Sequence, residues 1–268
     1  MNRKLLALAL ASLLVLVAAV PLTMSEEEVK LGGRRIVGGE KTDIKNHPWQ
    51  VALNVHKAGQ TFLCGGSIIA HRWVLTAAHC FAANLAPSQV RTKSGVTDYA
   101  TGNWIDVDRL VVHENFDAST YANDVALIMP RSPPDGRVIP LMAAGIALRV
   151  GQTLEVTGWG ATSESGDSSR DLLKGNVPYV ENATCNEPAS YNGMIRPGMM
   201  CAGHREGGID SCQGDSGGPL VWRSPDGPVL VGVVSFGEGC ARKLKYGVYT
   251  RVAEFRTWIS RSMAANAN

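Results

Sequence analysis

Short apolar runs separated by turn residues make up most of the pattern of hydrophobic and polar positions along the chain. The runs are rich in β-branched residues, and turn clusters such as Gly65–Gly66 and Pro225–Asp226–Gly227 bound most of them. Many short strands at close spacing favour an all-β barrel or sandwich. The predicted strands cover residues 50–55, 66–69, 73–77, 106–112, 125–128, 153–157, 229–236 and 247–251.

The C-terminal stretch has a helical pattern instead. Its apolar residues recur at spacings of three and four, as in the stripe of an amphipathic helix. These residues are Val252, Phe255, Trp258, Ile259 and Met263. After about Ser262 the chain turns to Ala and Asn, and from that point a disordered tail is the alternative.

The N-terminal segment predicts the compartment. Arg3 and Lys4 precede an uncharged apolar run over residues 5–20, which small residues close. This pattern is typical of a secretory signal peptide, so we expect residues 1–19 to be removed, with the cut near Ala19. A membrane anchor is the alternative, but a spanning helix needs roughly 20 apolar residues. We therefore expect a secreted protein, extracellular or, in a bacterial host, periplasmic, with no stable membrane association.

Composition narrows the class of protein. Of the 268 residues, 45% are hydrophobic and 19% charged, which excludes a disordered chain. Lys and Arg number 26 against 24 Asp and Glu, and so even a balance predicts no nucleic-acid partner. The six cysteines are expected to form disulfides in an exported protein, although six cysteines allow about 15 pairings. No CxxC pair is present, so no structural zinc site is expected.

Two short motifs hold candidate acid–base groups. His79 lies in Thr76–Cys80, at the end of a predicted strand, and histidine is the usual general base near neutral pH. Taken singly, it could equally be a core or surface residue. Asp124 directly precedes the predicted strand 125–128. A buried carboxylate there could orient an imidazole, or it could cap a turn.

The third motif, Asp210–Pro219, is more specific. Glycines on both sides of Ser216 allow a tight backbone turn and leave the hydroxyl accessible. The N–H groups of Gly214 and Ser216 could then converge on a developing oxyanion. A plain glycine-rich turn would leave the two aspartates and the cysteine of the motif unexplained.

Four motifs in order carry a family resemblance. They are IVGG at 36–39, TAAHC at 76–80, NDVAL at 123–127 and DSCQGDSGGP at 210–219. From Ile36 to about Ile259 the chain resembles the trypsin-like serine proteases of the chymotrypsin family. The resemblance implies an all-β fold of two six-stranded antiparallel β-barrels packed against each other, with a C-terminal α-helix. Residues 36–268 are the expected peptidase domain.

The resemblance also assigns roles. It makes Ser216 the nucleophile that forms an acyl-enzyme, His79 the general base and Asp124 the residue that orients His79. Gly214 and Ser216 supply the oxyanion-hole N–H groups, and Ser235 contacts the aspartate and lines the substrate strand. The alternative is a catalytically silent homologue that acts as a binding module. Such homologues usually lose a triad member, and all three are present here.

Substrate preference follows from the same resemblance. Asp210 occupies the position of the floor of the primary specificity pocket, and Gly237 and Gly247 match its walls. A buried carboxylate pairs with a cationic side chain, so cleavage after Arg or Lys is implied. The implied partners are polypeptides with Arg or Lys at the cleavage site and proteinaceous inhibitors of serine proteases. We expect a monomer.

Activation by proteolysis is implied as well. Residues 20–35 are the expected propeptide, and a cut at Arg35–Ile36 frees an α-amine. In the family this cation pairs with the acid before the nucleophile, here Asp215, and orders the oxyanion loop. Arg35 suits a trypsin-like activator, including another copy of the same enzyme.

All six cysteines match positions that are paired in the family. The implied bridges are Cys64–Cys80, Cys185–Cys201 and Cys212–Cys240. This pairing leaves no free thiol, and no cysteine remains to hold the propeptide after cleavage.

Three departures from the family pattern concern subsites and cofactors. Phe236 stands where tryptophan is usual, so the subsite next to the primary pocket is expected to differ. Residues 90–106 lack the paired glutamates of the calcium loop of digestive trypsins, so calcium is not implied and no cofactor is required. The segment 239–247 resembles the sodium-binding loop of coagulation proteases, chiefly in Tyr246. A basic surface loop is the alternative that we favour.

Overall fold

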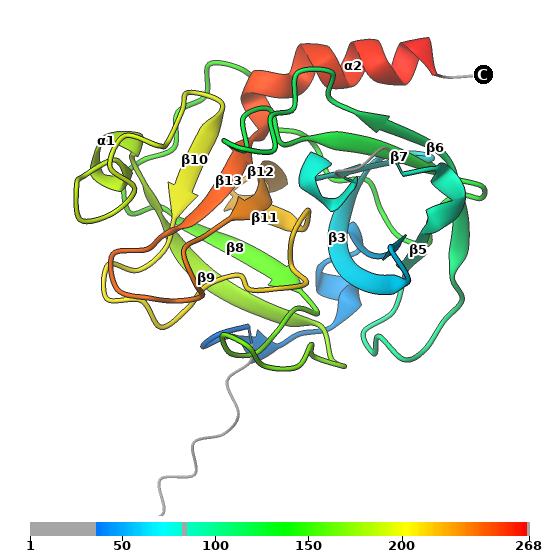
Figure 1. Cartoon of the computed structure of the whole chain (residues 1–268), viewed down its shortest axis with the longest axis horizontal. Coiled ribbons are helices and arrows are strands. Elements are labelled where there is room, and N and C mark those ends of the chain that lie inside the picture. The colour runs from blue at the N-terminus through cyan, green and yellow to red at the C-terminus, as the bar shows by residue number, and fades with distance from the viewer. Residues whose placement is uncertain (1–35, 82–84, 267–268) are drawn as a thin grey trace, which may run out of the picture. The chain divides into compact units, whose positions relative to one another are not determined.

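The computed structural model describes residues 36–81 and 85–266. The predicted signal peptide, the predicted propeptide and Arg35 lie outside these residues. Most of the secondary structure in the described part is β-strand, and one longer helix lies near the C-terminal end (Figure 1).

The first barrel contains six strands that are closed in the order β2-β3-β4-β7-β6-β5, with every pair antiparallel. Its strands are β2 (Gln50–Lys57), β3 (Gln60–Ala70), β4 (Trp73–Thr76), β5 (Val90–Ser94), β6 (Ile105–Val112) and β7 (Ala126–Pro130).

The second barrel is also antiparallel and follows the order β9-β10-β13-β12-β11-β8, and the pairing of β8 with β9 closes it. Its strands are β8 (Thr153–Gly158), β9 (Leu173–Val180), β10 (Met199–Ala202), β11 (Pro219–Ser224), β12 (Gly227–Phe236) and β13 (Gly247–Arg251). The short β1 (Glu40–Lys41) adds to β9. The expectation of two six-stranded antiparallel barrels is confirmed.

Within residues 36–81 and 85–266, six helical segments connect or flank the barrels. They are η1 (Ile44–Asn46), η2 (Ala78–Phe81), η3 (Pro87–Gln89), α1 (Asn182–Cys185), η4 (Val252–Phe255) and α2 (Arg256–Ala265). The expected C-terminal helix is confirmed, but a tail beginning after Ser262 is wrong, because α2 continues to Ala265. Met263 packs against the buried core, and the side-chain Nδ2 of Asn266, the residue after the helix, donates to the Ser262 carbonyl at 2.9 Å.

The hydrophobic pattern did not predict four of the barrel strands, namely β5, β9, β10 and β11. β5 reads VRTKS and is largely polar, while β9 contains both Gly175 and Pro178. β10 has only four residues, and β11 begins at a proline inside the glycine-rich motif. Pairing with neighbouring strands, rather than local apolar character, makes these segments extended.

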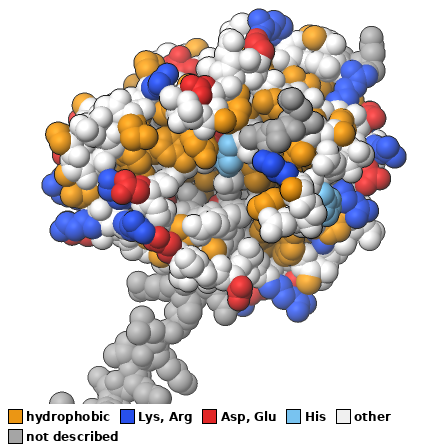
Figure 2. Space-filling view, viewed as in Figure 1, with side chains coloured by type: hydrophobic (Ala, Val, Ile, Leu, Met, Phe, Trp, Pro, Cys, Tyr) orange, Lys and Arg blue, Asp and Glu red, His pale blue; other side chains and the backbone are white. Residues whose placement is uncertain are grey.

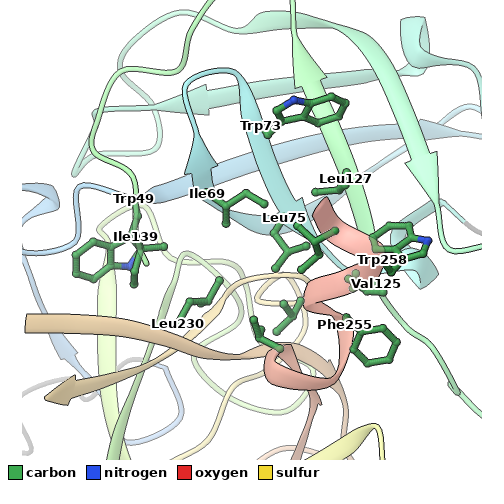
Figure 3. Packing of buried hydrophobic residues seen from close by; sticks show 14 of the residues in the cluster. Trp49, Ile69, Trp73, Leu75, Val125, Leu127, Ile139, Leu230, Phe255 and Trp258 are labelled. Carbon is green, nitrogen blue, oxygen red and sulfur yellow. The ribbon is translucent and has the colours of Figure 1, made fainter. Parts of the chain in front are cut away.

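One hydrophobic cluster joins the two barrels and the C-terminal helix. Leu75 and Leu127 reach it from the first barrel, Leu230 from the second and Trp258 from α2, and Figure 3 labels these side chains within the cluster. Burying one such side chain contributes roughly 1.5–3 kcal/mol. A hydrogen bond of 2.6 Å from Thr157 Oγ1 to Gln50 Oε1 also links the barrels. Segments from both barrels are thereby held in one frame.

Within residues 36–81 and 85–266, the structure contains no helix with the length and apolar character that crossing a membrane requires.

Candidate active site

Strand pairing in the first barrel brings His79 and Asp124 together. β4 and β7 are neighbours, with Thr76 paired to Ala126, so the segments just beyond these strand ends meet. The His79 backbone N–H donates to Asp124 Oδ1, and His79 Nδ1 lies 2.8 Å from Asp124 Oδ2. The carboxylate is 1% exposed, and these bonds offset the cost of burying it.

Two residues of the second barrel also bind Asp124. The Ser235 hydroxyl donates to Asp124 Oδ2 at 2.5 Å, which is the contact that the resemblance implied. Thr250 Oγ1 donates to the Asp124 backbone carbonyl at 2.6 Å. Thr250 was not predicted, since nothing in its local sequence distinguishes it from other strand threonines. The aspartate is therefore held from both barrels.

Ser216 lies on a tight turn before β11. Gly214 and Gly217 have φ values of +94° and +81°, which favour glycine, and a Cβ at Gly217 would lie 2.2 Å from Thr76 Oγ1. The Ser216 carbonyl accepts the Gly65 N–H at 2.7 Å. Among the described residues, no hydrogen bond uses the N–H groups of Gly214 or Ser216 as donors. Both donors are thus available to an oxyanion.

His79 and Ser216 line the same cavity of about 340 Å³. In the described part of the chain, no hydrogen bond joins His79 Nε2 to Ser216 Oγ. Catalytic hydrogen bonds are commonly long before substrate binds and tighten in the complex. The space-filling view shows hydrophobic side chains gathered over the β8–β13 barrel on this face, with many charged groups toward the edge (Figure 2).

The same cavity contains the predicted pocket residues. Asp210, Ser235, Gly237 and Gly247 all line it, and Asp210 is 4% exposed. Burial raises the pKa of Asp210 to about 7, although the Ala241 N–H donates to its Oδ2 at 3.0 Å. A Cβ at Gly247 would lie 2.8 Å from Asp210 Oδ1, so glycine keeps this carboxylate accessible.

Asp215 is the second buried acid of the motif. It is fully buried and accepts the backbone N–H groups of Gly160 at 2.9 Å and Cys212 at 3.0 Å. Burial raises its pKa to about 6, and no side-chain cation of residues 36–81 and 85–266 forms an ion pair with it. Ile36 is buried in the core cluster of the second barrel.

The three disulfides join the cysteines in the implied pairs. Cys64–Cys80 connects β3 to η2, which carries His79, and Cys212–Cys240 closes one side of the pocket. Cys185–Cys201 joins α1 to β10.

Two tyrosines that the sequence did not identify, Tyr121 and Tyr191, pack against Phe236 beside the cavity. The Tyr121 ring centroid lies 5.5 Å from that of His79 and 5.1 Å from that of Phe236. Tyr191 contacts Phe236 edge-on at 5.9 Å. Tyr121 lies two positions before the NDVAL motif, and that position is its only signal in the sequence.

Lysine side chains occupy both segments that correspond to cation-binding loops of related proteases, 90–106 for calcium and 239–247 for sodium. Lys93, 3% exposed, donates through Nζ to the Tyr99 carbonyl at 2.9 Å within 90–106. Next to Tyr246, Lys245 Nζ donates to the Ser190 carbonyl at 2.9 Å. No group of three or more His, Cys, Asp or Glu in the described residues is arranged to hold a metal ion.

Two antiparallel barrels, with His79, Asp124 and Ser216 gathered in one site, are typical of the two-barrel serine proteases. The family model described as Trypsin matches residues 36–259, and the chain belongs to this family. It is 38% identical over 233 residues to Transmembrane protease serine 11C of Mus musculus, an alignment that covers 85% of this chain and 53% of that protein. The chain therefore spans about half the length of this curated relative.

Proposed function

We propose that the chain is a secreted serine endopeptidase, made as an inactive precursor, that cleaves polypeptides after Arg or Lys. The main support is that His79, Ser216 and Asp210 line one cavity, where no side-chain cation of residues 36–81 and 85–266 forms an ion pair with the buried carboxylate of Asp210. A cationic side chain of a substrate would supply the missing charge.

The proposed chemistry is acyl transfer. Ser216 Oγ attacks the scissile carbonyl carbon as its proton passes to His79 Nε2, and the tetrahedral oxyanion accepts the N–H groups of Gly214 and Ser216. His79 then protonates the leaving amine, the C–N bond breaks, and an acyl-enzyme remains. Water then attacks the acyl carbon as its proton passes to His79. The ester bond to Ser216 breaks, the acid leaves, and His79 returns the proton to Ser216 Oγ.

Asp124 acts through His79 in this scheme. Its Oδ2 lies 2.8 Å from Nδ1, so the Nδ1–H tautomer is favoured and Nε2 is left to accept the serine proton. The negative charge also stabilises the imidazolium that forms during each step.

Activation is proposed to work through Asp215. A cut at Arg35–Ile36 frees the α-amine of Ile36, and this ammonium pairs with the buried carboxylate. The pairing raises the pKa of the amine above its free value of about 7.7–8.0. Stabilisation from the pair is therefore full at lower pH and is lost as pH rises through the raised value, so activity declines in the alkaline range. An enzyme acetylated on this amine that kept full activity would contradict the proposal.

Secretion is proposed from the N-terminal pattern alone. The printed name of the mouse relative calls that protein a transmembrane protease, and an anchored form is the alternative here. N-terminal sequencing of the protein recovered from culture medium decides between them. If the signal peptide is removed, the chain begins near residue 20.

The experiment that tests the function uses precursor cut at Arg35–Ile36. We expect hydrolysis of peptide libraries after Arg and Lys, and stoichiometric labelling of Ser216 by a serine-directed phosphonate. The Ser216→Ala variant is the control and should lose labelling and almost all turnover. Cut protein that takes up no phosphonate and cleaves nothing would instead be the silent binding module, which is the alternative.

No metal cofactor is proposed, because lysine ammonium groups lie in both segments where cations were considered. Removing divalent metal with EDTA, and replacing sodium chloride by choline chloride, should each leave kcat/KM for an Arg peptide unchanged. A several-fold loss in choline chloride would instead assign a sodium site next to Tyr246.

A further inference from the structure

The rim of the pocket contains a strained residue. Ala241 has a φ of +57°, in the left-handed region that costs an L residue free energy and that glycine usually occupies. Its N–H donates to Asp210 Oδ2 at 3.0 Å, and its carbonyl accepts the Gly208 N–H at 3.0 Å. The strained conformation therefore points a hydrogen-bond donor at the buried carboxylate.

A side chain from another loop holds both neighbours of Ala241. Glu164 lies between β8 and β9, and its carboxylate forms two bonds to the Arg242 guanidinium, one of them from Nε to Oε2 at 2.9 Å. Glu164 Oε2 also accepts the Cys240 N–H at 3.4 Å. Two planar charged groups that bind in this paired way have a defined geometry.

We propose that Glu164 is a positioning residue for the binding of Arg and Lys side chains. It fixes the residues on either side of Ala241, and so keeps the Ala241 N–H directed at Asp210. This role rests on the proposed recognition of Arg and Lys by Asp210. Without Glu164, Ala241 relaxes toward a negative φ, and its N–H turns away from the carboxylate.

The first experiment compares activated wild type with Glu164→Ala on an Arg peptide, with concentrations set by active-site titration. We expect KM to rise about three- to fivefold, the range that an exposed ion pair supports, with kcat within about twofold. Arg242→Ala should do the same. Glu206→Ala is the matched control, because Glu206 pairs with Lys243 on the same loop, is exposed and contacts neither neighbour of Ala241.

Rescue separates positioning from a general structural effect. Ala241→Gly added to Glu164→Ala should bring KM back to within about twofold of wild type, since glycine adopts a positive φ without strain. Exchanging the charges in the double variant Glu164→Arg, Arg242→Glu should also restore KM in part. If Glu164→Ala gives no folded protein, Glu164→Gln serves in its place.

Several outcomes would overturn the role of Glu164. They are an unchanged KM in Glu164→Ala, an equal effect in Glu206→Ala, a loss confined to kcat, or no recovery with Ala241→Gly. A wild type that cleaves after Arg while Glu164→Ala is unchanged refutes only this role. A wild type that ignores Arg and Lys refutes the proposed function, and the positioning role falls with it.

Discussion

Asp124 shows how a buried charge is made tolerable by its neighbours. Its carboxylate accepts from His79 and Ser235, and its carbonyl accepts from Thr250. Each of these donors comes from a different element, so the carboxylate has one orientation. Because Asp124 holds Nδ1, Nε2 is the ring nitrogen of His79 that is left to accept a proton.

Removing the Ser235 hydroxyl should loosen this orientation. We expect Ser235→Ala to lower kcat by at least about tenfold, because a hydrogen bond to a charged group is worth roughly 1.5–3 kcal/mol. Steady-state kinetics on an Arg peptide, with active-site titration, measures the effect. Ser260→Ala, on the exposed side of α2, is the control and should match wild type. An unchanged kcat in Ser235→Ala would contradict the role of this bond.

The raised pKa of Asp210 predicts how substrate preference depends on pH. Burial raises it to about 7, and only the ionised carboxylate attracts a cationic side chain. The ratio of kcat/KM for an Arg peptide to that for a matched Leu peptide should fall as pH drops below about 7, approaching tenfold per pH unit. Taking the ratio cancels any pH dependence that affects both substrates equally.

A ratio that stays constant between about pH 5.5 and 8 would contradict this interpretation of Asp210. Asp210→Asn is the informative variant, because it keeps the shape of the side chain and removes the titration. Its ratio should be low at every pH.

The local pattern of hydrophobic residues predicts some strands and not others. The predicted strands 50–55, 153–157 and 247–251 correspond closely to β2, β8 and β13, because their apolar residues face a core. The pattern did not predict β5 or β9, because polar residues, glycine and proline interrupt their apolar positions. Their extended form depends on partners distant in the chain, to which a local window has no access.

The C-terminal helix should contribute to stability by burying Trp258 between the barrels. Trp258 is buried in the cluster that joins both barrels, and its Nε1 donates to Glu114 Oε2 at 2.7 Å. Trp258→Ala should lower the free energy of unfolding by about 3–5 kcal/mol through the cavity it leaves. Urea unfolding in a Ser216→Ala background, which prevents self-cleavage, measures it.

Thr257→Ala is the matched control for this helix, because Thr257 is exposed and adjacent. Its free energy of unfolding should stay within about 0.5 kcal/mol of wild type. A Trp258→Ala loss of the same small size would show that α2 contributes little to holding the barrels together.

At the scale of the whole molecule, Asp215 couples folding to pH before the chain is cut. Its folded pKa, about 6, exceeds the unfolded value of 3.8, so the folded state binds more protons between these values. The contribution of Asp215 to the free energy of unfolding is therefore most favourable below about pH 4, and it becomes less favourable as pH rises to about 6. The size of the fall is about 3 kcal/mol.

The prediction concerns single-chain protein in the Ser216→Ala background. The difference in unfolding free energy between this protein and its Asp215→Asn variant should change by about 2–2.5 kcal/mol between pH 4 and 7. Asp226→Asn, in an exposed turn, is the control and should show no such change. A pH-independent difference for Asp215→Asn would mean that the buried carboxylate is not destabilising in the uncut chain.

Short motifs were sufficient to identify the fold family and most candidate site residues, because glycine, histidine, aspartate and serine at those spacings serve few purposes together. His79, Asp124, Ser216 and Asp210 were all selected in this way. Thr250 and Tyr121 were not, since a strand threonine or a loop tyrosine has many ordinary uses. The Glu164–Arg242 contact also has no local signature, because it joins residues 78 positions apart.

Residue identity and order thus established the family, the arrangement of two barrels and the types of chemical group available. Folding decided which groups meet: strand pairing sets His79 beside Asp124, and burial raises the pKa values of Asp210 and Asp215. Desolvation and the distances between groups depend on three-dimensional packing, so the local sequence does not determine them.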